Sequence, residues 1–173
     1  MLHIVLFQPE MPANVGNIMR TAVALNAILH IIFPTLAGIS GWNFDDKNLR
    51  RAGLDYISDL SLFLYEDFAD FDNKHHDKKI VYVTRYGKNN YSEYKYGRYD
   101  DEIYIMFGNE SHGIPLDILK SHKEELVRIP MVASARSLNL SNSVAIISYE
   151  IMRQQGFYNL ATQEMIKGND FLD

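Results

Sequence analysis

The stretch IPMVASARSLNLSNSVA, residues 129–145, joins an apolar run to a helix-like segment that begins on serines and asparagines. Pro130 cannot donate a hydrogen bond to a sheet, so the apolar run before it should end there. Ser and Asn side chains accept hydrogen bonds from the first backbone N–H groups of a helix, and such helix starts attract polar or anionic ligands. The stretch therefore predicts a strand, a loop and a capped helix. The loop is either an ordinary connection or part of a ligand site.

Short apolar runs alternate with longer segments along the rest of the chain. Continuous apolar runs are typical of parallel strands that helices cover on both faces, and this alternation predicts an α/β fold with a parallel sheet. We expect strands at 3–7, 30–33, 80–84, 103–107 and 126–129, and helices at 14–25, 46–52, 60–68, 115–121 and 138–154. We expect a surface loop at 70–79 with solvated His75 and His76, because further metal ligands are missing at suitable spacing.

Length and composition indicate one globular domain over residues 1–173. Cysteine is absent, which excludes disulfides, thiolate metal sites and cysteine nucleophiles. The apolar runs are shorter than the roughly 18 residues that cross a bilayer, and the chain begins in a strand-like run rather than a signal peptide. We therefore expect a cytoplasmic protein with no membrane partner.

The net charge of −5 opposes indiscriminate nucleic-acid binding, because phosphate-binding surfaces usually carry clustered Lys and Arg. Two local patterns remain compatible with RNA. Lys47, Arg50 and Arg51 would lie on one side of a helix, either as RNA-binding cations or as a solvated face. The segment 86–104 interleaves six tyrosines with Lys and Arg, which suits either stacking on unpaired bases or amphipathic edge structure.

Two further blocks carry polar residues next to predicted strand ends. Asn14 can cap the helix that follows the first strand, and the guanidinium of Arg20 on that helix can bind a phosphate or carboxylate. Gly108 and Gly113 frame a loop that contains Glu110, at the carboxyl end of a predicted strand, where α/β proteins bind ligands. Each block alone also fits an ordinary cap or turn. The chain has no Gly-x-Gly dinucleotide loop, Walker motif or Gly-x-Ser-x-Gly elbow.

The helix predicted over 138–154 is apolar on more than one side. One sheet cannot cover all of these residues, so the remainder is buried either inside the monomer or against a second subunit. We expect a homodimer contact here, with burial inside the monomer as the alternative.

Together and in this order, the blocks resemble the SpoU motifs of the SPOUT superfamily of RNA methyltransferases. The likeness rests on Asn14-x-Gly16-Asn17-Ile18-x-Arg20, on segment 45–56, on Phe107-Gly108-x-Glu110-x-x-Gly113 and on Arg136-Ser137-Leu138-Asn139-Leu140-Ser141-Asn142. It covers nearly the whole chain and is greatest to the minimal TrmL-like (YibK-like) branch. The resemblance implies a C-terminal deep trefoil knot, which residue patterns alone would not predict because connections rarely thread.

The resemblance also implies a site for S-adenosylmethionine and no metal. The implied cofactor-binding residues are Val83, Gly108, Ile129 and Ser137. The implied catalytic residues are Arg20, Asn14, Glu110, Asn139 and Tyr149, and the implied RNA-binding residues are Arg50, Arg51 and Arg136. An arginine pKa above about 12 leaves almost no neutral form at pH 7, so Arg20 suits phosphate binding and alkoxide stabilisation better than proton removal. Tyr149 has an alternative role as a core or dimer-contact residue.

The activity implied by the resemblance is 2′-O-methylation of the ribose of the tRNA wobble nucleotide, cytidine or uridine 34, with tRNA and a second copy of the chain as partners. Two alternatives are the same transfer to another tRNA or rRNA ribose and an idle RNA-binding relative. His112 stands where related chains often carry a basic residue, and segment 36–44 looks longer than in minimal relatives. Both departures could alter RNA contacts.

Overall fold

The computed structural model describes residues 1–33 and 59–167. Within these residues, a seven-stranded sheet has the order β3-β2-β1-β6-β4-β7-β5, and its neighbouring strands pair in parallel. The strands are β1 (Leu2–Phe7), β2 (Ile28–Ile32), β3 (Ser61–Tyr65), β4 (Ile80–Val83), β5 (Asn89–Asn90), β6 (Ile103–Phe107) and β7 (Leu126–Arg128). The helices are α1 (Pro12–Ala24), α3 (Phe68–His75), α4 (Leu116–Ser121), the 3-10 turn η3 (Lys123–Glu125) and α5 (Leu140–Gln154).

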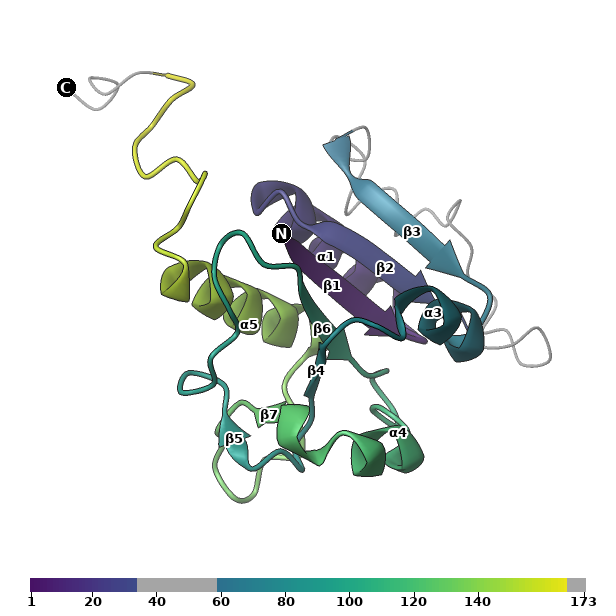
Figure 1. Cartoon of the computed structure of the whole chain (residues 1–173). Helices are drawn as coiled ribbons and strands as arrows, with labels where there is room; N and C mark the ends of the chain where they lie inside the picture. The colour runs from purple at the N-terminus through teal and green to yellow at the C-terminus, as the bar shows by residue number, and fades with distance from the viewer. Residues whose placement is uncertain (34–58, 168–173) are drawn as a thin grey trace.

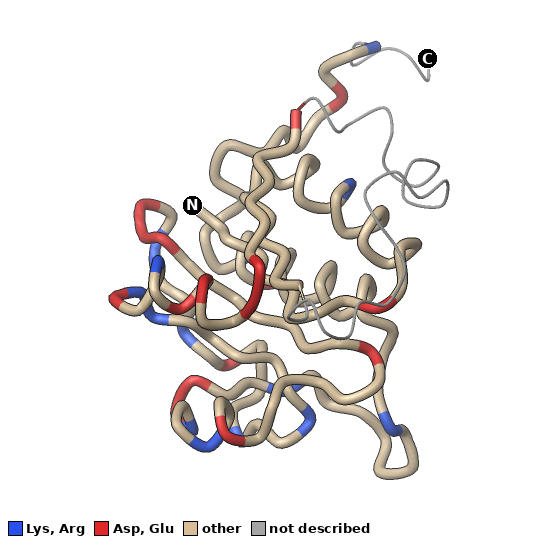
Figure 2. The backbone as a smooth tube through the Cα atoms, turned by 90° about the vertical axis from the view of Figure 1, so that its right-hand side faces the viewer, with Lys and Arg blue, Asp and Glu red and all other residues tan. Residues whose placement is uncertain are grey.

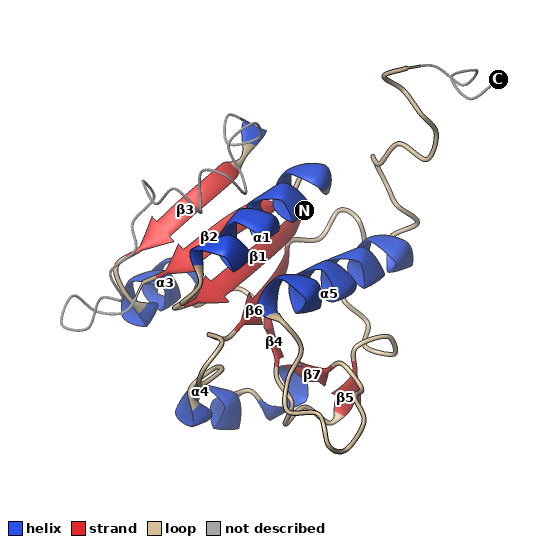
Figure 3. Cartoon of the chain, turned by 180° about the vertical axis from the view of Figure 1, so that it is seen from behind, coloured by secondary structure: helices blue, strands red, loops and turns tan. Residues whose placement is uncertain are grey.

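Helices cover both faces of the sheet. Helices α1 and α5 lie on one face (Figure 3), and α3 and α4 lie on the other (Figure 1). Because successive strand residues point to opposite faces, Ile105 of β6 belongs to the α1/α5 core and Met106 to the α3/α4 core. Both residues are fully buried, which is why the central strands read as continuous apolar runs.

The predicted parallel-sheet α/β fold is confirmed. The five predicted strands correspond to β1, β2, β4, β6 and β7, and three predicted helices correspond to α1, α4 and α5, with ends that differ by at most two residues. The predicted helix at 46–52 and the segment 36–44 lie outside the described residues.

The helix predicted at 60–68 is wrong. Residues 61–65 instead form β3, which pairs with β2 in a parallel register that sets Ile28 opposite Ser61. The helix starts only after Asp67, whose side chain accepts a hydrogen bond from the Asp70 backbone N–H at 2.9 Å. Strand pairing with β2 therefore outweighed the helical spacing of the apolar residues in this segment, and the helix α3 begins only after the Asp67 cap.

The loop predicted at 70–79 is also wrong in its first part, because α3 continues to His75. His75 is not solvated: its Nε2 lies 2.9 Å from the Tyr65 hydroxyl, in hydrogen-bond contact. His76 is exposed, as expected. The amphipathic spacing of α3 places Phe71 in the core and brings His75 to the same side one turn later.

The carboxyl ends of strands β1, β4, β6 and β7 lie at the same end of the sheet, because these strands run parallel. Basic positions are interspersed with acidic ones along the loops of the molecule (Figure 2). Among the described residues, every helix is too short or too polar to cross a membrane.

Parallel sheets bind ligands beyond the carboxyl ends of their strands. A pocket with a volume of about 670 Å³ lies at this position, beyond the carboxyl ends of the strands.

Candidate functional site

The pocket at the carboxyl edge is built by loops from distant parts of the chain. Residues 83–86 follow β4, residues 107–114 include the end of β6 and its loop, and residues between 129 and 143 connect β7 to α5. Met11 and Asn14, at the start of α1, complete the wall. Pockets of about 300–1,000 Å³ suit small molecules, so the space fits a ligand of cofactor size.

Glu110 joins the β6 loop to the start of α1. Its carboxylate accepts hydrogen bonds from the backbone N–H groups of Glu10 and Met11 at 2.8 and 3.2 Å and from Asn14 Nδ2 at 2.8 Å. The residue at the helix cap, Met11, makes no side-chain capping bond, so Glu110 supplies an acceptor in its place. A carboxylate here also interacts favourably with the positive end of the helix dipole.

Asn14 connects Glu110 to the start of α5 through hydrogen bonds. The Asn139 side-chain amide donates to Asn14 Oδ1 at 3.0 Å, and Asn139 Oδ1 accepts from the backbone N–H groups of Ser141 and Asn142. Asn139 is therefore the N-cap of α5, which begins at Leu140, two residues after the predicted start at 138, and it is also hydrogen-bonded to Asn14. The hydrogen bonds from Glu110 through Asn14 to Asn139 join three chain segments, and we name these residues the polar triad.

The loop 108–113 is held in one shape by close backbone packing. A Cβ atom on Gly108 would lie 2.2 Å from the Gly113 carbonyl carbon, and Gly113 has a φ of +73°. Asn109 Oδ1 accepts from the backbone N–H groups of His112 and Gly113. Ser111 Oγ donates to Glu10 Oε2 at 2.5 Å, a second contact with the segment before α1. Glycine is therefore favoured at both positions that frame the loop: a side chain at 108 would clash with the backbone, and the positive φ at 113 strains other residues.

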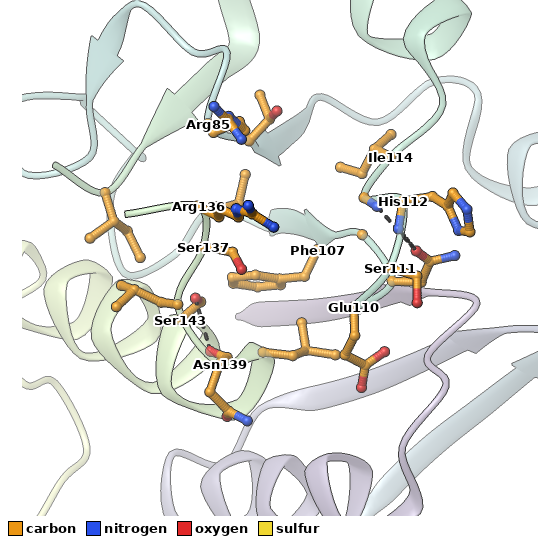
Figure 4. Close-up of a pocket in the computed structure, with 18 of the residues that line it drawn as sticks. Arg85, Phe107, Glu110, Ser111, His112, Ile114, Arg136, Ser137, Asn139 and Ser143 are labelled. Carbon is orange, nitrogen blue, oxygen red and sulfur yellow. Dashed lines mark hydrogen bonds between the residues drawn. The ribbon is translucent and has the colours of Figure 1, made fainter. Parts of the chain in front are cut away.

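Most of the predicted site residues meet at the pocket. The polar triad and Arg136 line it. So do the four residues predicted to bind a cofactor, which are Val83, Gly108, Ile129 and Ser137. Arg85 and Arg136 lie on one side of the pocket, across from Ser111 and His112, and the Phe107 ring lies beside Ser137 (Figure 4). The pocket thus combines an apolar floor with two cationic side chains.

Two predicted site residues lie outside this pocket, and two more lie outside the described residues. Arg20 lies on an exposed position of α1, and Tyr149 lies on α5 with 48% of its surface exposed; neither lines the pocket. Arg50 and Arg51 lie outside the described residues. Their roles stay predictions.

Several pocket residues were not individually predicted as site residues, notably Arg85, Asn109 and Met131, and Tyr86 was considered only as one of the six tyrosines of segment 86–104. Arg85 and Tyr86 come directly after the predicted strand 80–84, so the rule that ligands bind beyond strand ends could have indicated them. Asn109 lies between the framing glycines, where a short polar side chain commonly caps a turn. Met131 had no such signal.

Two buried histidines on the α3/α4 face, away from this pocket, have strongly lowered pKa values. Burial lowers the pKa of His3 to about 4, although nearby Glu102 raises it, and burial lowers the pKa of His30 to about 3. A hydrogen-bonded chain runs from His3 through His30 and Tyr65 to His75, with contacts of 2.9, 2.8 and 2.9 Å. The imidazoles of His3 and His30 are therefore neutral structural groups of the core, and burial also lowers the pKa of the partly buried His75.

The chain is similar in sequence to known RNA methyltransferases. The model of the SpoU rRNA methylase family matches residues 1–149. An Escherichia coli protein named tRNA (cytidine(34)-2'-O)-methyltransferase is 40% identical over 158 residues, which cover 91% of this chain and 96% of that protein.

Two solved structures have the same fold. One, described as giving structural insights into the 2-OH methylation of C/U34 on tRNA, has a TM-score of 0.79 and 37% identity and covers 91% of this chain and 97% of its own. The other is an AdoMet-bound rRNA methyltransferase from Sinorhizobium meliloti, with a TM-score of 0.75, 24% identity and coverage of 88% of this chain and 56% of its own. The second similarity concerns the fold alone.

Proposed function

Because this chain belongs to the SpoU rRNA methylase family, we propose that it transfers a methyl group from S-adenosylmethionine to the 2′-hydroxyl of nucleotide 34 in tRNA. The observation that carries the proposal is the pocket itself, in which the polar triad lies beside the predicted cofactor residues. The family description names rRNA, but the Escherichia coli relative matches over nearly its full length and is named for tRNA. Position 34 is therefore favoured over another tRNA or rRNA ribose.

The pocket suits S-adenosylmethionine in size and chemistry. Val83, Phe107 and Ile129 provide apolar surface for an adenine ring, and Ser137 provides a hydroxyl near the start of α5. The cofactor would supply an activated methyl group to a nucleophilic oxygen. Binding sites of this kind combine apolar walls with a few placed polar groups.

The polar triad holds the substrate side of the pocket in place. Glu110 already accepts hydrogen bonds from three donors, so its carboxylate suits positioning better than proton removal. Asn14 and Asn139 fix the distance between α1 and α5, because their amides bond each other. Methyl transfer requires the attacking oxygen, the carbon and the leaving sulfur to lie in line, and fixed walls provide that alignment.

Two cationic residues, one in the pocket and one outside it, would bind the RNA backbone. Arg136 lines the pocket, and Arg20 is exposed on α1. Arg20 would hold a substrate phosphate and stabilise the charge that develops on the ribose oxygen. Arg50 and Arg51 would extend this surface, and tRNA as the substrate would place the protein in the cytoplasm.

The proposed enzyme is a homodimer. On α5, Ile146 and Tyr149 are 37% and 48% exposed, and Asn142 and Arg153 lie along the same side of the helix. The other side of α5 is buried against the monomer core through Val144, Ile147 and Ile151. Exposed apolar residues on a helix of this kind favour a contact with a second copy, in which Tyr149 would take part.

The proposed fold includes the deep trefoil knot. Residues 83–86, 107–114 and the connection from β7 to α5 surround one pocket, and the chain then crosses to pack α5 beside α1 (Figure 3). A knot formed by these segments would bring all three loops to the cofactor.

Two measurements separate an active enzyme from an idle RNA-binding relative. Calorimetry should detect S-adenosylmethionine binding to the purified protein, and labelled methyl groups should appear in unmodified tRNA. Absence of binding at near-millimolar S-adenosylmethionine would refute the enzyme proposal. Binding without transfer to any tRNA would support the idle relative instead.

A further inference from the structure

The turn after β4 is a rigid part of the pocket rim. The Thr84 backbone N–H donates to the Val127 carbonyl of β7 at 2.9 Å, and the Gly87 N–H donates back to the Thr84 carbonyl at 3.2 Å. The Tyr86 backbone N–H also lies 3.3 Å from Thr84 Oγ1. A Cβ atom on Gly87 would lie 2.7 Å from the Val127 carbonyl carbon, so the turn is tightly packed on β7.

This turn presents an aromatic ring and a guanidinium together. Tyr86 is 64% exposed although it lines the pocket. The Arg85 guanidinium carbon lies 5.7 Å from the centre of the Tyr86 ring, within cation–π distance. Arg136 lies on the same side of the pocket as Arg85 (Figure 4). The rim therefore offers a flat aromatic face with two cations nearby.

The other tyrosines of segment 86–104 have structural partners. Tyr96 is buried and donates its hydroxyl to the Tyr91 carbonyl at 2.9 Å, and Tyr91 and Tyr94 pack against the core. Tyr99 is exposed but stacks on Tyr158, with ring centres 4.2 Å apart. Among these residues, only Tyr86 lines the pocket, so the amphipathic-edge interpretation explains the others and leaves Tyr86 unexplained.

We propose that Tyr86 stacks on a nucleobase of the bound RNA at the pocket mouth, while Arg85 contacts an adjacent phosphate. This inference rests on the proposed function and names the residues that receive the substrate nucleotide. A base stacks on any aromatic face without hydrogen-bond readout, so this contact accepts cytosine and uracil alike. Arginine beside the ring adds charge attraction to the RNA backbone and a planar surface of its own.

The position of Tyr86 favours RNA over the cofactor. Phe107 and Ile114 are buried and form the inner surface of the pocket, whereas Tyr86 and Arg85 are exposed at its rim. A small cofactor is held mainly by inner apolar walls, and a polymeric substrate approaches from the rim. The protein carries a net charge of −5, so cations at the mouth matter for attracting phosphate locally.

The test measures RNA affinity directly, with a fluorescently labelled anticodon stem-loop RNA and the full-length protein. Tyr86→Ala should weaken RNA binding by about 5- to 150-fold, the range for loss of one base stack. Tyr86→Phe, which keeps the ring, should restore binding to within about twofold of wild type. Tyr99→Ala is the matched control, because it removes an equally aromatic exposed side chain outside the pocket.

Arg85→Ala should weaken binding at low salt and reduce the slope of log affinity against log salt by about 1, as expected for one lost phosphate contact. Calorimetry should find unchanged S-adenosylmethionine affinity in Tyr86→Ala. Unchanged RNA affinity in Tyr86→Ala would overturn the inference, and so would loss of S-adenosylmethionine affinity, which would assign Tyr86 to the cofactor wall. Failure of wild-type protein to methylate tRNA is a separate result, because RNA affinity is measured without transfer.

Discussion

Asn139 donates its side-chain amide to Asn14 Oδ1 across 125 residues of sequence, at 3.0 Å. The orientation of both amides is fixed from two directions. Glu110 only accepts hydrogen bonds in its ionised form, so Asn14 must turn its Nδ2 toward Glu110 and its oxygen toward Asn139. The backbone N–H groups at the start of α5 require the Asn139 oxygen, which leaves the Asn139 amide for Asn14. Neither side chain can flip without losing bonds on both sides.

Asn139→Asp should separate helix capping from positioning. Asp keeps an oxygen for the Ser141 and Asn142 N–H groups but sets a second acceptor against Asn14 Oδ1, so methyl transfer should fall at least tenfold with little loss of stability. Asn139→Ala removes the cap as well and should lower the unfolding free energy by about 1 kcal/mol. Urea unfolding and methyl-transfer assays of both variants would check this; full activity in Asn139→Asp would contradict the positioning role.

Glu110→Gln should damage both stability and activity. The substitution brings an NH₂ group toward three donors, so at least one of them loses its acceptor, with a cost of about 1–3 kcal/mol in unfolding free energy. Glu93→Gln, at an exposed position outside the pocket, is the matched control. Equal stability of the two variants by thermal unfolding would show that the carboxylate bonds are dispensable.

Gly108→Ala should distort the pocket more than Gly113→Ala. The added methyl group at 108 meets backbone atoms at 2.2–2.5 Å, whereas nothing lies within 4 Å of the one at 113. Overpacking against backbone costs about 1–3 kcal/mol, and left-handed φ at 113 costs an alanine about 1–2 kcal/mol. Calorimetry should therefore show weaker S-adenosylmethionine binding in Gly108→Ala; the reverse order would contradict the packing assigned to this loop.

Acid should destabilise the protein through its buried histidines. The folded-state pKa values of His3 and His30, about 4 and about 3, lie below the ordinary histidine value, so unfolding takes up protons as the pH falls below about 6.5. Stability should be full above that pH and then decline toward pH 4, by about 1.4 kcal/mol per pH unit for each proton taken up.

Urea unfolding between pH 7.5 and pH 4.5 measures this slope. His3→Gln removes one titrating group and should make the decline shallower, whereas His76→Gln, at an exposed position, should leave it unchanged. A slope in His3→Gln equal to that of wild type would exclude His3 as a source of the acid sensitivity.

Local rules place Asn14, Glu110 and Asn139 at strand ends or helix starts, but it is the resemblance to the SPOUT family that selects these three as site residues. The sequence does not predict their mutual hydrogen bonds, which depend on the tertiary arrangement of three segments. The error at 60–68 has a local reason: Asp67 was available as a cap, but an edge strand of mixed exposure has no clear alternation. Tyr86 was noticed only within a tyrosine-rich segment, since pocket access depends on the turn that Gly87 packs against β7.

The most direct test of the proposed function maps the methyl group by mass spectrometry after incubating wild-type protein and S-adenosylmethionine with unmodified tRNA. We predict one new methyl group on the ribose of nucleotide 34, and none when that nucleotide carries a 2′-deoxyribose. Methylation at another ribose, or equal methylation of the 2′-deoxy tRNA, would contradict the assignment of substrate and reaction to this pocket.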